Sequence, residues 1–202
     1  MATSTNPKLN SVNRILRALG YSVVSSTETS DPAVVSALDA LNDASREVQV
    51  KPLWFNQTKI TLIPNTNSEI ELPQNTTSVQ ALRRANQPWA SGRFIQRGAR
   101  LYDTDNNTYT ITENVDVVLI LELEFNDLPY TAQNYITARA ITEVTYDTDK
   151  STQDFSVYSD REQKALRELK TENINTSNSN MLMSPERTMN NMTSRLGGRV
   201  YR

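Results

Sequence analysis

Residues 46–62 read REVQVKPLWFNQTKITL, and the hydrophobic period changes inside this stretch. Apolar residues up to Val48 recur at helical spacing, whereas Lys59 to Leu62 alternate between polar and apolar, as in a half-buried strand. Pro52 stands between the two patterns and cannot continue a helix, because it lacks an amide proton and its ring clashes with the preceding turn. The sequence therefore predicts helices before Pro52 and β-structure after it.

Two helices are predicted upstream of Pro52, each opened by the same signal. Asn6-Pro7 and Asp31-Pro32 both place a capping side chain before a proline at the first helical position. The first helix is predicted to end at Gly20 and the second near Lys51, so that residues 6–51 form the first helical pair. The apolar residues at helical spacing are Leu9, Val12, Leu16 and Leu19, then Val34, Leu38, Leu41 and Val48.

Short alternating runs predict an antiparallel β-domain over residues 52–125. Residues 76–92 show no clear period, so that this segment is either a long loop or a weak strand. The predicted strands are residues 59–62 paired with 69–72, a hairpin over residues 94–102 that turns near Gly98, and strands over residues 108–112 and 117–125.

The helical period returns after Phe125 and predicts a second helical pair over residues 126–175. A two-helix piece cannot bury its apolar face alone. We therefore predict an α+β fold in which a four-helix bundle is interrupted by an antiparallel β-domain insert and followed by an extended C-terminal tail. The predicted buried residues are Ala132, Tyr135, Ile136, Ala140 and Val144 in the third helix, and Phe155, Tyr158, Ala165, Leu166 and Leu169 in the fourth, which begins near Asp154.

The composition excludes several classes of active site. The chain of 202 residues has neither cysteine nor histidine, which removes thiolate nucleophiles, cysteine-based metal sites and histidine-based triads. No glycine-rich phosphate loop is present in the sequence, so we predict no cofactor and no metal. The N-terminus lacks the features of a signal peptide, and no apolar run reaches the roughly 20 residues of a membrane span. We expect the chain to be cytosolic where it is made and not to enter a membrane.

Pairs of carboxylates are the remaining candidate catalytic groups. Glu122 and Glu124 lie two residues apart on a predicted strand and would project from one face about 7 Å apart, within the ~6.5–9.5 Å window of inverting glycosidases. Any solvated strand face gives the same spacing, and Glu69 and Glu71 repeat it. We therefore interpret both pairs as solvated strand faces and predict no catalytic residue.

Residues 103–107, Asp-Thr-Asp-Asn-Asn, resemble the start of a calcium-binding loop. Thr108 stands where that loop needs glycine for its sharp turn, and Asn114 stands where it needs a bidentate glutamate. A polar turn is the interpretation that fits both departures.

The last part of the chain, residues 176–202, differs from the rest in charge and periodicity. It carries four arginines against one acid, Glu186, so its net charge is +3 and the preceding body must carry −5 for the chain to reach −2. Every methionine except Met1 lies there, and flexible methionine side chains suit irregular pockets on a partner. The residues predicted to bind a partner are Met181, Leu182, Met183, Arg187, Met189, Met192, Arg195, Leu196, Arg199, Tyr201 and Arg202.

Residues 11–20, SVNRILRALG, resemble the opening helix motif of the tail tubular protein A family of short-tailed, T7-like bacteriophages. The resemblance covers about residues 9–170 and rests on the order and spacing of short motifs. It departs at Lys51-Pro52-Leu53, where a Gly-Trp pair is expected, and the tail does not match position by position. The further motifs lie, in order, at residues 46–49, 54–56, 62–64, 101–103 and 125–129.

This resemblance implies a structural virion protein of the phage tail, assembled in the host cytoplasm. It implies a ring of twelve subunits that forms the adaptor between the portal protein above and the tail nozzle below, near the tail fibres, with a channel through which DNA is ejected. The acidic body lacks clustered positive charge, so we expect passive DNA passage without specific binding. Two rival functions remain: a tail-associated hydrolase of cell wall or polysaccharide, and a carbohydrate-binding host-recognition module on the β-domain.

Overall fold

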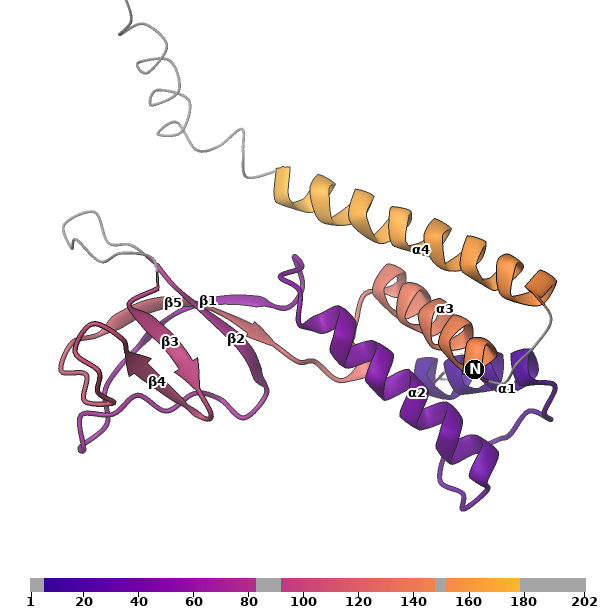
Figure 1. The fold of residues 1–202 in the computed structure, drawn as a ribbon, viewed down its shortest axis with the longest axis horizontal. Coiled ribbons are helices and arrows are strands. Elements are labelled where there is room, and N and C mark those ends of the chain that lie inside the picture. The colour runs from indigo at the N-terminus through magenta and orange to yellow at the C-terminus, as the bar shows by residue number, and fades with distance from the viewer. Residues whose placement is uncertain (1–5, 83–91, 148–151, 179–202) are drawn as a thin grey trace, which may run out of the picture.

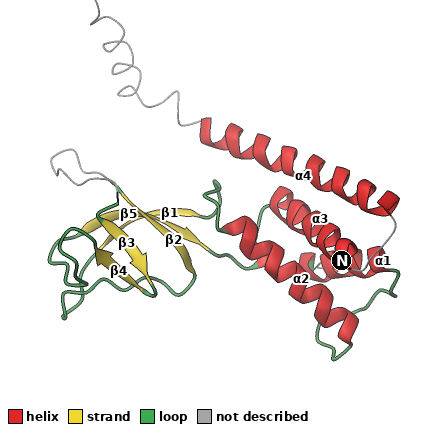
Figure 2. Cartoon of the chain, viewed as in Figure 1, coloured by secondary structure: helices red, strands yellow, loops and turns green. Residues whose placement is uncertain are grey.

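The computed structural model describes residues 6–82, 92–147 and 152–178, which form a helical region and a strand region side by side (Figure 1). The chain begins and ends its described part in helices, and the strands lie between them (Figure 2). The α+β class predicted from the sequence is confirmed. The helices are α1 (Pro7–Leu19), α2 (Pro32–Gln49), α3 (Tyr130–Asp147) and α4 (Thr152–Asn178), with a short 3₁₀ helix η1 (Phe125–Asp127).

Both predicted start signals are used in the helical region. Asn6 Oδ1 accepts the amides of Lys8 and Leu9 at 3.1 and 3.3 Å, and Asp31 Oδ1 accepts the Ala33 amide at 2.9 Å. Gly20 ends α1 with a φ of 85°, a left-handed conformation that glycine adopts without steric cost. The second helix ends at Gln49, slightly before the predicted Lys51.

The helices share one hydrophobic core that contains most of the apolar residues predicted from periodicity. In Figure 1, α3 lies between α2 and α4, and it contacts α1, α2 and α4. Ala165 and Leu169 are the buried residues by which α4 joins this core. None of the described helices combines the length and hydrophobicity that a membrane crossing requires. The fully buried core residues include Val12, Ile15, Val34, Ala37, Leu41, Ala44, Ala132, Ile136 and Ala140.

The strand region contains a three-stranded antiparallel sheet in the order β1-β5-β2 and a separate β3-β4 hairpin. Its core includes Ile70, Leu101, Val115, Val117 and Leu119. The hairpin predicted to turn near Gly98 is confirmed, and β2 lies in the segment that the sequence left open between loop and strand. The strands are β1 (Gln57–Leu62), β2 (Thr76–Ala81), β3 (Phe94–Arg97), β4 (Arg100–Asp103) and β5 (Val115–Leu121).

The predicted pairing of residues 59–62 with residues 69–72 is wrong. The intervening turn forms, since the Asn65 amide donates to the Glu69 carbonyl at 2.8 Å, but β1 pairs with β5. Residues 69–72 run beside β4 instead, where the Leu101 amide donates to the Ile70 carbonyl at 3.0 Å. Alternation predicts which face of a strand is buried, but it carries no information about the partner strand.

The predicted strands at residues 108–112 and 117–125 also differ from the structure. Residues 108–112 form no strand: they make the isolated bridge from Thr108 to Asp103 and a hydrogen bond from the Ile111 amide to the Ser68 carbonyl at 2.7 Å. The last strand is β5, which ends at Leu121. Glu122 and Glu124 therefore follow the strand and are not neighbours on its face. After Leu121 the ladder is no longer regular: the Glu122 amide donates to the Asn75 carbonyl at 2.7 Å, and the Gln49 side chain binds the backbone of Leu123.

Candidate interaction surfaces

The residues predicted to bind a partner, from Met181 to Arg202, all lie outside the described residues. Their role stays a prediction. The described part offers four features with clustered polar or charged side chains: the junction between the two regions, a cleft beside it, an ion-pair cluster on the β3–β4 hairpin, and a groove between helices.

Two buried amide side chains hold the junction where the chain passes between the helical and strand regions. Gln49, at the end of α2, is fully buried. Its Nε2 donates to the Leu123 carbonyl and to Ser45 Oγ, both at 3.0 Å, and its Oε1 accepts the Leu123 amide at 2.8 Å. Gln49 thus binds both backbone groups of Leu123, as a neighbouring strand would.

Asn56, 1% exposed, fixes the other crossing of the same junction. Its Oδ1 accepts the Leu53 amide at 2.9 Å, and its Nδ2 donates to the carbonyls of Gln49 at 2.8 Å and Lys51 at 3.1 Å. The Asn56 carbonyl accepts the Leu121 amide at 2.9 Å. The entry to β1 and the exit from β5 are therefore both tied to the end of α2.

A polar cleft of about 430 Å³ lies beside this junction, lined by residues that include Lys8, Arg46, Glu122 and Glu124. The structure thus brings the two glutamates singled out in the sequence to one cleft. Glu122 Oε1 lies 3.7 Å from Arg46 Nε, and its backbone amide donates to the Asn75 carbonyl at 2.7 Å. This ion pair is largely exposed and so contributes little to stability, and the backbone hydrogen bond to Asn75 is the firmer contact that holds Glu122 beside the junction.

An ion-pair cluster stabilises the β3–β4 hairpin and the turn after it. The Asp103 side chain, 2% exposed, accepts from Arg93 Nη2 at 2.7 Å and Nε at 3.1 Å, and from Asn106 Nδ2 at 2.9 Å. Burial alone would raise the pKa of Asp103, but the hydrogen bonds from Arg93 and Asn106 and the charge of Arg93 lower it to about 2. The predicted polar turn at residues 104–107 is confirmed.

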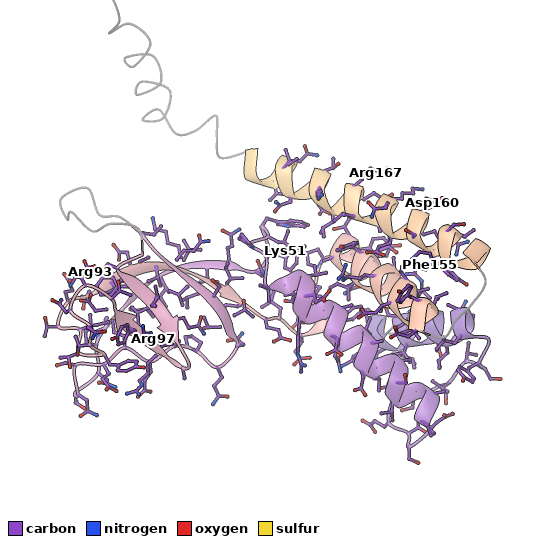
Figure 3. The ribbon with its side chains drawn as sticks, viewed as in Figure 1. Lys51, Arg93, Arg97, Phe155, Asp160 and Arg167 are labelled. Atoms are coloured by element: carbon purple, nitrogen blue, oxygen red, sulfur yellow. The ribbon has the colours of Figure 1, made fainter. Side chains whose placement is uncertain are left out.

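Other arginines of this hairpin lie over aromatic rings. The guanidinium carbon of Arg97 is 3.7 Å from the centroid of Tyr102, and that of Arg100 is 4.3 Å from the centroid of Tyr109. Figure 3 shows Arg93 and Arg97 on this part of the strand region. Arg100 also pairs with Glu69 at 2.9 Å. The arginines of the hairpin are therefore contacted by acids and aromatic rings of the same chain.

A basic groove runs between α1 and α4 over α3. Two adjoining hollows of about 260 and 180 Å³ share Arg14, Ala138 and Arg161. The cations that line them, which we call the basic groove residues, are Arg14, Arg17, Arg161 and Lys164.

Within the described part of the chain, none of the four basic groove residues forms an ion pair with a carboxylate. Arg14 Nη1 donates to Asn134 Oδ1 at 3.2 Å, and the Arg161 guanidinium lies 5.7 Å from the Tyr158 ring. One acid, Glu168, lines the same groove. The groove is therefore positively charged on a chain whose overall charge is negative.

Sequence reasoning did not find the junction amides or the basic groove. Gln49 lies between two valines and Asn56 follows Trp54 and Phe55, but no pattern in the sequence marks either polar side chain as buried. The groove residues come in two pairs spaced three apart, Arg14 with Arg17 and Arg161 with Lys164, which places each pair on one helix face. Nothing in the sequence says that these two faces meet. Within the described residues, no group of three or more potential ligand side chains could hold a metal ion.

Known proteins resemble this chain over most of its length. A family model described as tail tubular protein matches residues 9–179. The tail tubular protein A of Klebsiella phage KP34 is 29% identical over 136 residues, which are 65% of this chain and 70% of that protein. Because the family match spans most of the 202 residues, the chain belongs to the tail tubular protein family.

Proposed function

We propose that this chain is a structural subunit of a bacteriophage tail that forms the ring-shaped adaptor between the portal protein and the tail nozzle. The observation that carries the proposal is the family match over residues 9–179, which includes every described element except the first residues of α1. The similarity to a tail tubular protein A supports the same role. The subunit acts in the virion, after assembly in the cytoplasm of the host.

The two regions divide this work. Residues 6–51 and 126–178 act as one four-helix bundle, which carries residues 52–125 as a β-domain. The boundary predicted at residue 175 moves to Asn178, where α4 ends, and residues 179–202 bind the portal or a neighbouring subunit. The shared core of the helices and the double crossing at Gln49 and Asn56 support a body that moves as one unit. Such a body suits a ring that must keep its channel open.

DNA passes through this ring without being held. Duplex DNA binds where lysines and arginines cluster, because their contacts with phosphates release counterions. The body of the chain is acidic overall, the arginines of its β3–β4 hairpin are engaged by carboxylates and aromatic rings, and we expect its basic groove to face away from the channel. An acidic channel wall repels phosphates and lets the duplex slide.

The mass of the purified protein, alone and mixed with the portal protein, tests this proposal. We expect a ring of twelve copies of the 22.8 kDa chain that joins the portal. Truncation after Asn178 keeps α4 whole and should leave the melting temperature of the body unchanged while portal attachment fails. A full-length chain that remains monomeric and ignores the portal would contradict the adaptor role.

The hydrolase alternative is tested at the cleft that holds Glu122 and Glu124. We expect no turnover of peptidoglycan or polysaccharide, because the subunit is structural. Turnover by the full-length protein that is lost in Glu122→Gln and Glu124→Gln would establish the hydrolase instead. Binding of the same polysaccharides without turnover would favour the carbohydrate-recognition module.

A further inference from the structure

An acidic strip lies on α2 and α3, away from the basic groove. Asp39, Asp43 and Glu47 are exposed and spaced four residues apart, which lines them up along one face of α2. Glu143 and Asp147 have the same spacing on α3, which packs against α2. We call these five residues the acidic strip.

Four of the five carboxylates of the acidic strip interact electrostatically, and Asp39 extends the row by one helical turn. Partial burial raises the pKa of Glu143, as do the charges of Glu47, Asp147 and Asp43, against the opposing charge of Arg139. Two cations offset the strip in part. Arg139 Nε donates to Glu47 Oε2 at 2.6 Å, and Arg46 lies 3.6 Å from Asp43 in a pair that is about two-thirds exposed. Both cations also pair with acids outside the strip, Arg46 with Glu122 at 3.7 Å and Arg139 with Glu162 at 3.5 Å, so at least three of the five negative charges remain uncompensated.

The strip and the groove lie on different flanks of the helical region. Ala138 of α3 lines the groove, and Glu143 and Asp147 follow it by five and nine residues. At about 100° per residue, these positions lie about 140° and about 180° around the helix from Ala138. One copy of the chain therefore cannot place its own strip in its own groove, but a second copy can.

We propose that neighbouring copies of this chain bind each other by placing the acidic strip of one copy against the basic groove of the next. This rests on the proposed ring and identifies the surfaces that build it. Two different surfaces on separate flanks make a heterologous contact, which generates a ring when the rotation between copies closes. The groove carries four cations and one acid, and the strip carries five acids against two cations that also pair with Glu122 and Glu162, so the two surfaces oppose each other in charge.

A second copy explains more of the surface than nucleic acid does. Phosphates could occupy the groove, but they would leave the acidic strip, on another flank of the helical region, without a binding partner. A neighbouring copy uses both surfaces at once. The floor of the groove also offers apolar side chains, Ala18, Ala138 and Ile141, and the strip is flanked by Tyr146, which is 73% exposed. Such apolar area inside a charged rim is usual for a protein interface.

Charge reversal on either surface tests the proposal in the full-length protein. We expect Arg161→Glu with Lys164→Glu to weaken assembly at least about tenfold in sedimentation, and Asp39→Lys with Asp43→Lys to do the same, because each juxtaposes like charges. The matched control is Arg167→Glu with Lys170→Glu, which makes the same change on α4 at exposed residues outside the groove (Arg167 is labelled in Figure 3). The control should assemble as the unmodified chain does.

The chain that carries all four reversals separates a specific contact from damage to the fold. Its groove becomes acidic and its strip basic, so we expect assembly to return. The proposal is wrong if the unmodified chain assembles and either pair of reversals leaves assembly unchanged. It is also wrong if the chain with all four reversals does not assemble. A monomeric unmodified chain would overturn the ring itself. Binding of a short DNA duplex that Arg161→Glu with Lys164→Glu abolishes, without any change in assembly, would assign the groove to nucleic acid.

Covalent capture gives a second measurement, since the chain contains no cysteine. Lys164→Cys together with Asp43→Cys places one thiol on each surface, and a short bismaleimide should link copies into a ladder of covalent oligomers. Arg167→Cys together with Asp43→Cys is the control and should give no ladder. Equal ladders from both variants would contradict the proposed surfaces.

Discussion

The helical and strand regions are both stabilised by a hydrophobic core, yet they reach it by different routes. The helical core draws on residues whose spacing along the chain already places them on one face, such as Val34, Leu41 and Val48. The strand core depends on pairings between distant segments, above all β1 and β2 on either side of β5. Local spacing therefore specifies the buried face of each helix, although the helices pack together across the strand region, whereas in the second region even the strand partners are set by long-range pairing.

The two regions also differ in how polar groups are used. The helical region leaves charges unpaired on its surface, as in the basic groove, whereas the hairpin of the strand region pairs its arginines with acids and aromatic rings. Gln49 and Asn56 belong to both regions, because they bind the backbone at each crossing. Substitutions in one region, or at this shared junction, therefore test whether the two regions are stabilised separately.

The largest effect is expected from Ile136→Ala in α3. Ile136 is fully buried in the helical core, and such a truncation removes transfer free energy and leaves a cavity. We expect a loss of about 3–4 kcal/mol in the free energy of unfolding, seen in urea titrations followed by helical circular dichroism. Ile63→Ala, at a residue 71% exposed, is the control and should cost little.

Hydrogen exchange in the Ile136→Ala variant sharpens the comparison. If the regions unfold separately, amides of α1–α3 lose protection while those of β5 keep it. Equal loss of protection in both regions would show that they form one cooperative unit.

Asn56→Ala should have the next largest effect and should act on both regions. It leaves the Leu53 amide and the Gln49 and Lys51 carbonyls without their partner, and each unsatisfied buried group costs about 1–3 kcal/mol. We expect a loss of about 2–3 kcal/mol in the free energy of unfolding, with protection lost in β1, β5 and the end of α2. Asn67→Ala, in an exposed turn, is the control. Unchanged protection of β5 would mean that Asn56 does not couple the regions.

The same contrast explains what the sequence could and could not predict. The helix starts at Asn6-Pro7 and Asp31-Pro32 were predictable because capping acts within three residues. The β3–β4 hairpin was predictable because Gly98 turns the chain on itself. The partner of β1 was not, because the apolar run of β5 lies more than fifty residues away and alternation does not name a partner.

The candidate surfaces were less predictable than the fold. The junction depends on Gln49, a polar residue that the helical pattern placed on no face, and on its contact with Leu123 far along the chain. The groove requires α1 and α4 to pack on α3 so that their basic faces border one hollow, which neither helix encodes alone. Family resemblance was visible in the sequence because it needs only the order of short motifs.

Acidification should weaken the strand region before the helical region, through Asp103. Its pKa in the folded chain is about 2, against an ordinary value of 3.8, so it stabilises the fold fully above pH 3.8 and loses this contribution as the pH falls towards 2. We expect the free energy of unfolding to fall by about 2 kcal/mol over this window. Hydrogen exchange of the amides in β3 and β4 measures this loss. Asp103→Asn should remove this pH dependence. A strand region that is equally stable at pH 5 and pH 2 would contradict the shift.

The smallest effect, and the one of opposite sign, is expected from Glu143→Gln. Because the folded chain raises the pKa of Glu143, its ionised form destabilises the fold above that pKa, and the cost disappears as the pH falls through it. Removing the charge should therefore stabilise the monomer slightly at neutral pH, by about 0.5 kcal/mol or less, because the residue is exposed. Thermal melting of dilute protein at pH 7 and at pH 4 measures this, and the gain should shrink at pH 4.

The same substitution should act in the opposite direction on assembly. The ionised Glu143 carboxylate destabilises the isolated subunit, but cations of a neighbouring copy would stabilise it. Glu143→Gln should therefore raise the melting temperature of the monomer and weaken the contact between copies. Glu28→Gln, at an exposed acid before α2, is the control and should change neither. A Glu143→Gln variant that is both more stable and better assembled would show that the acidic strip only destabilises the subunit and does not bind a neighbouring copy.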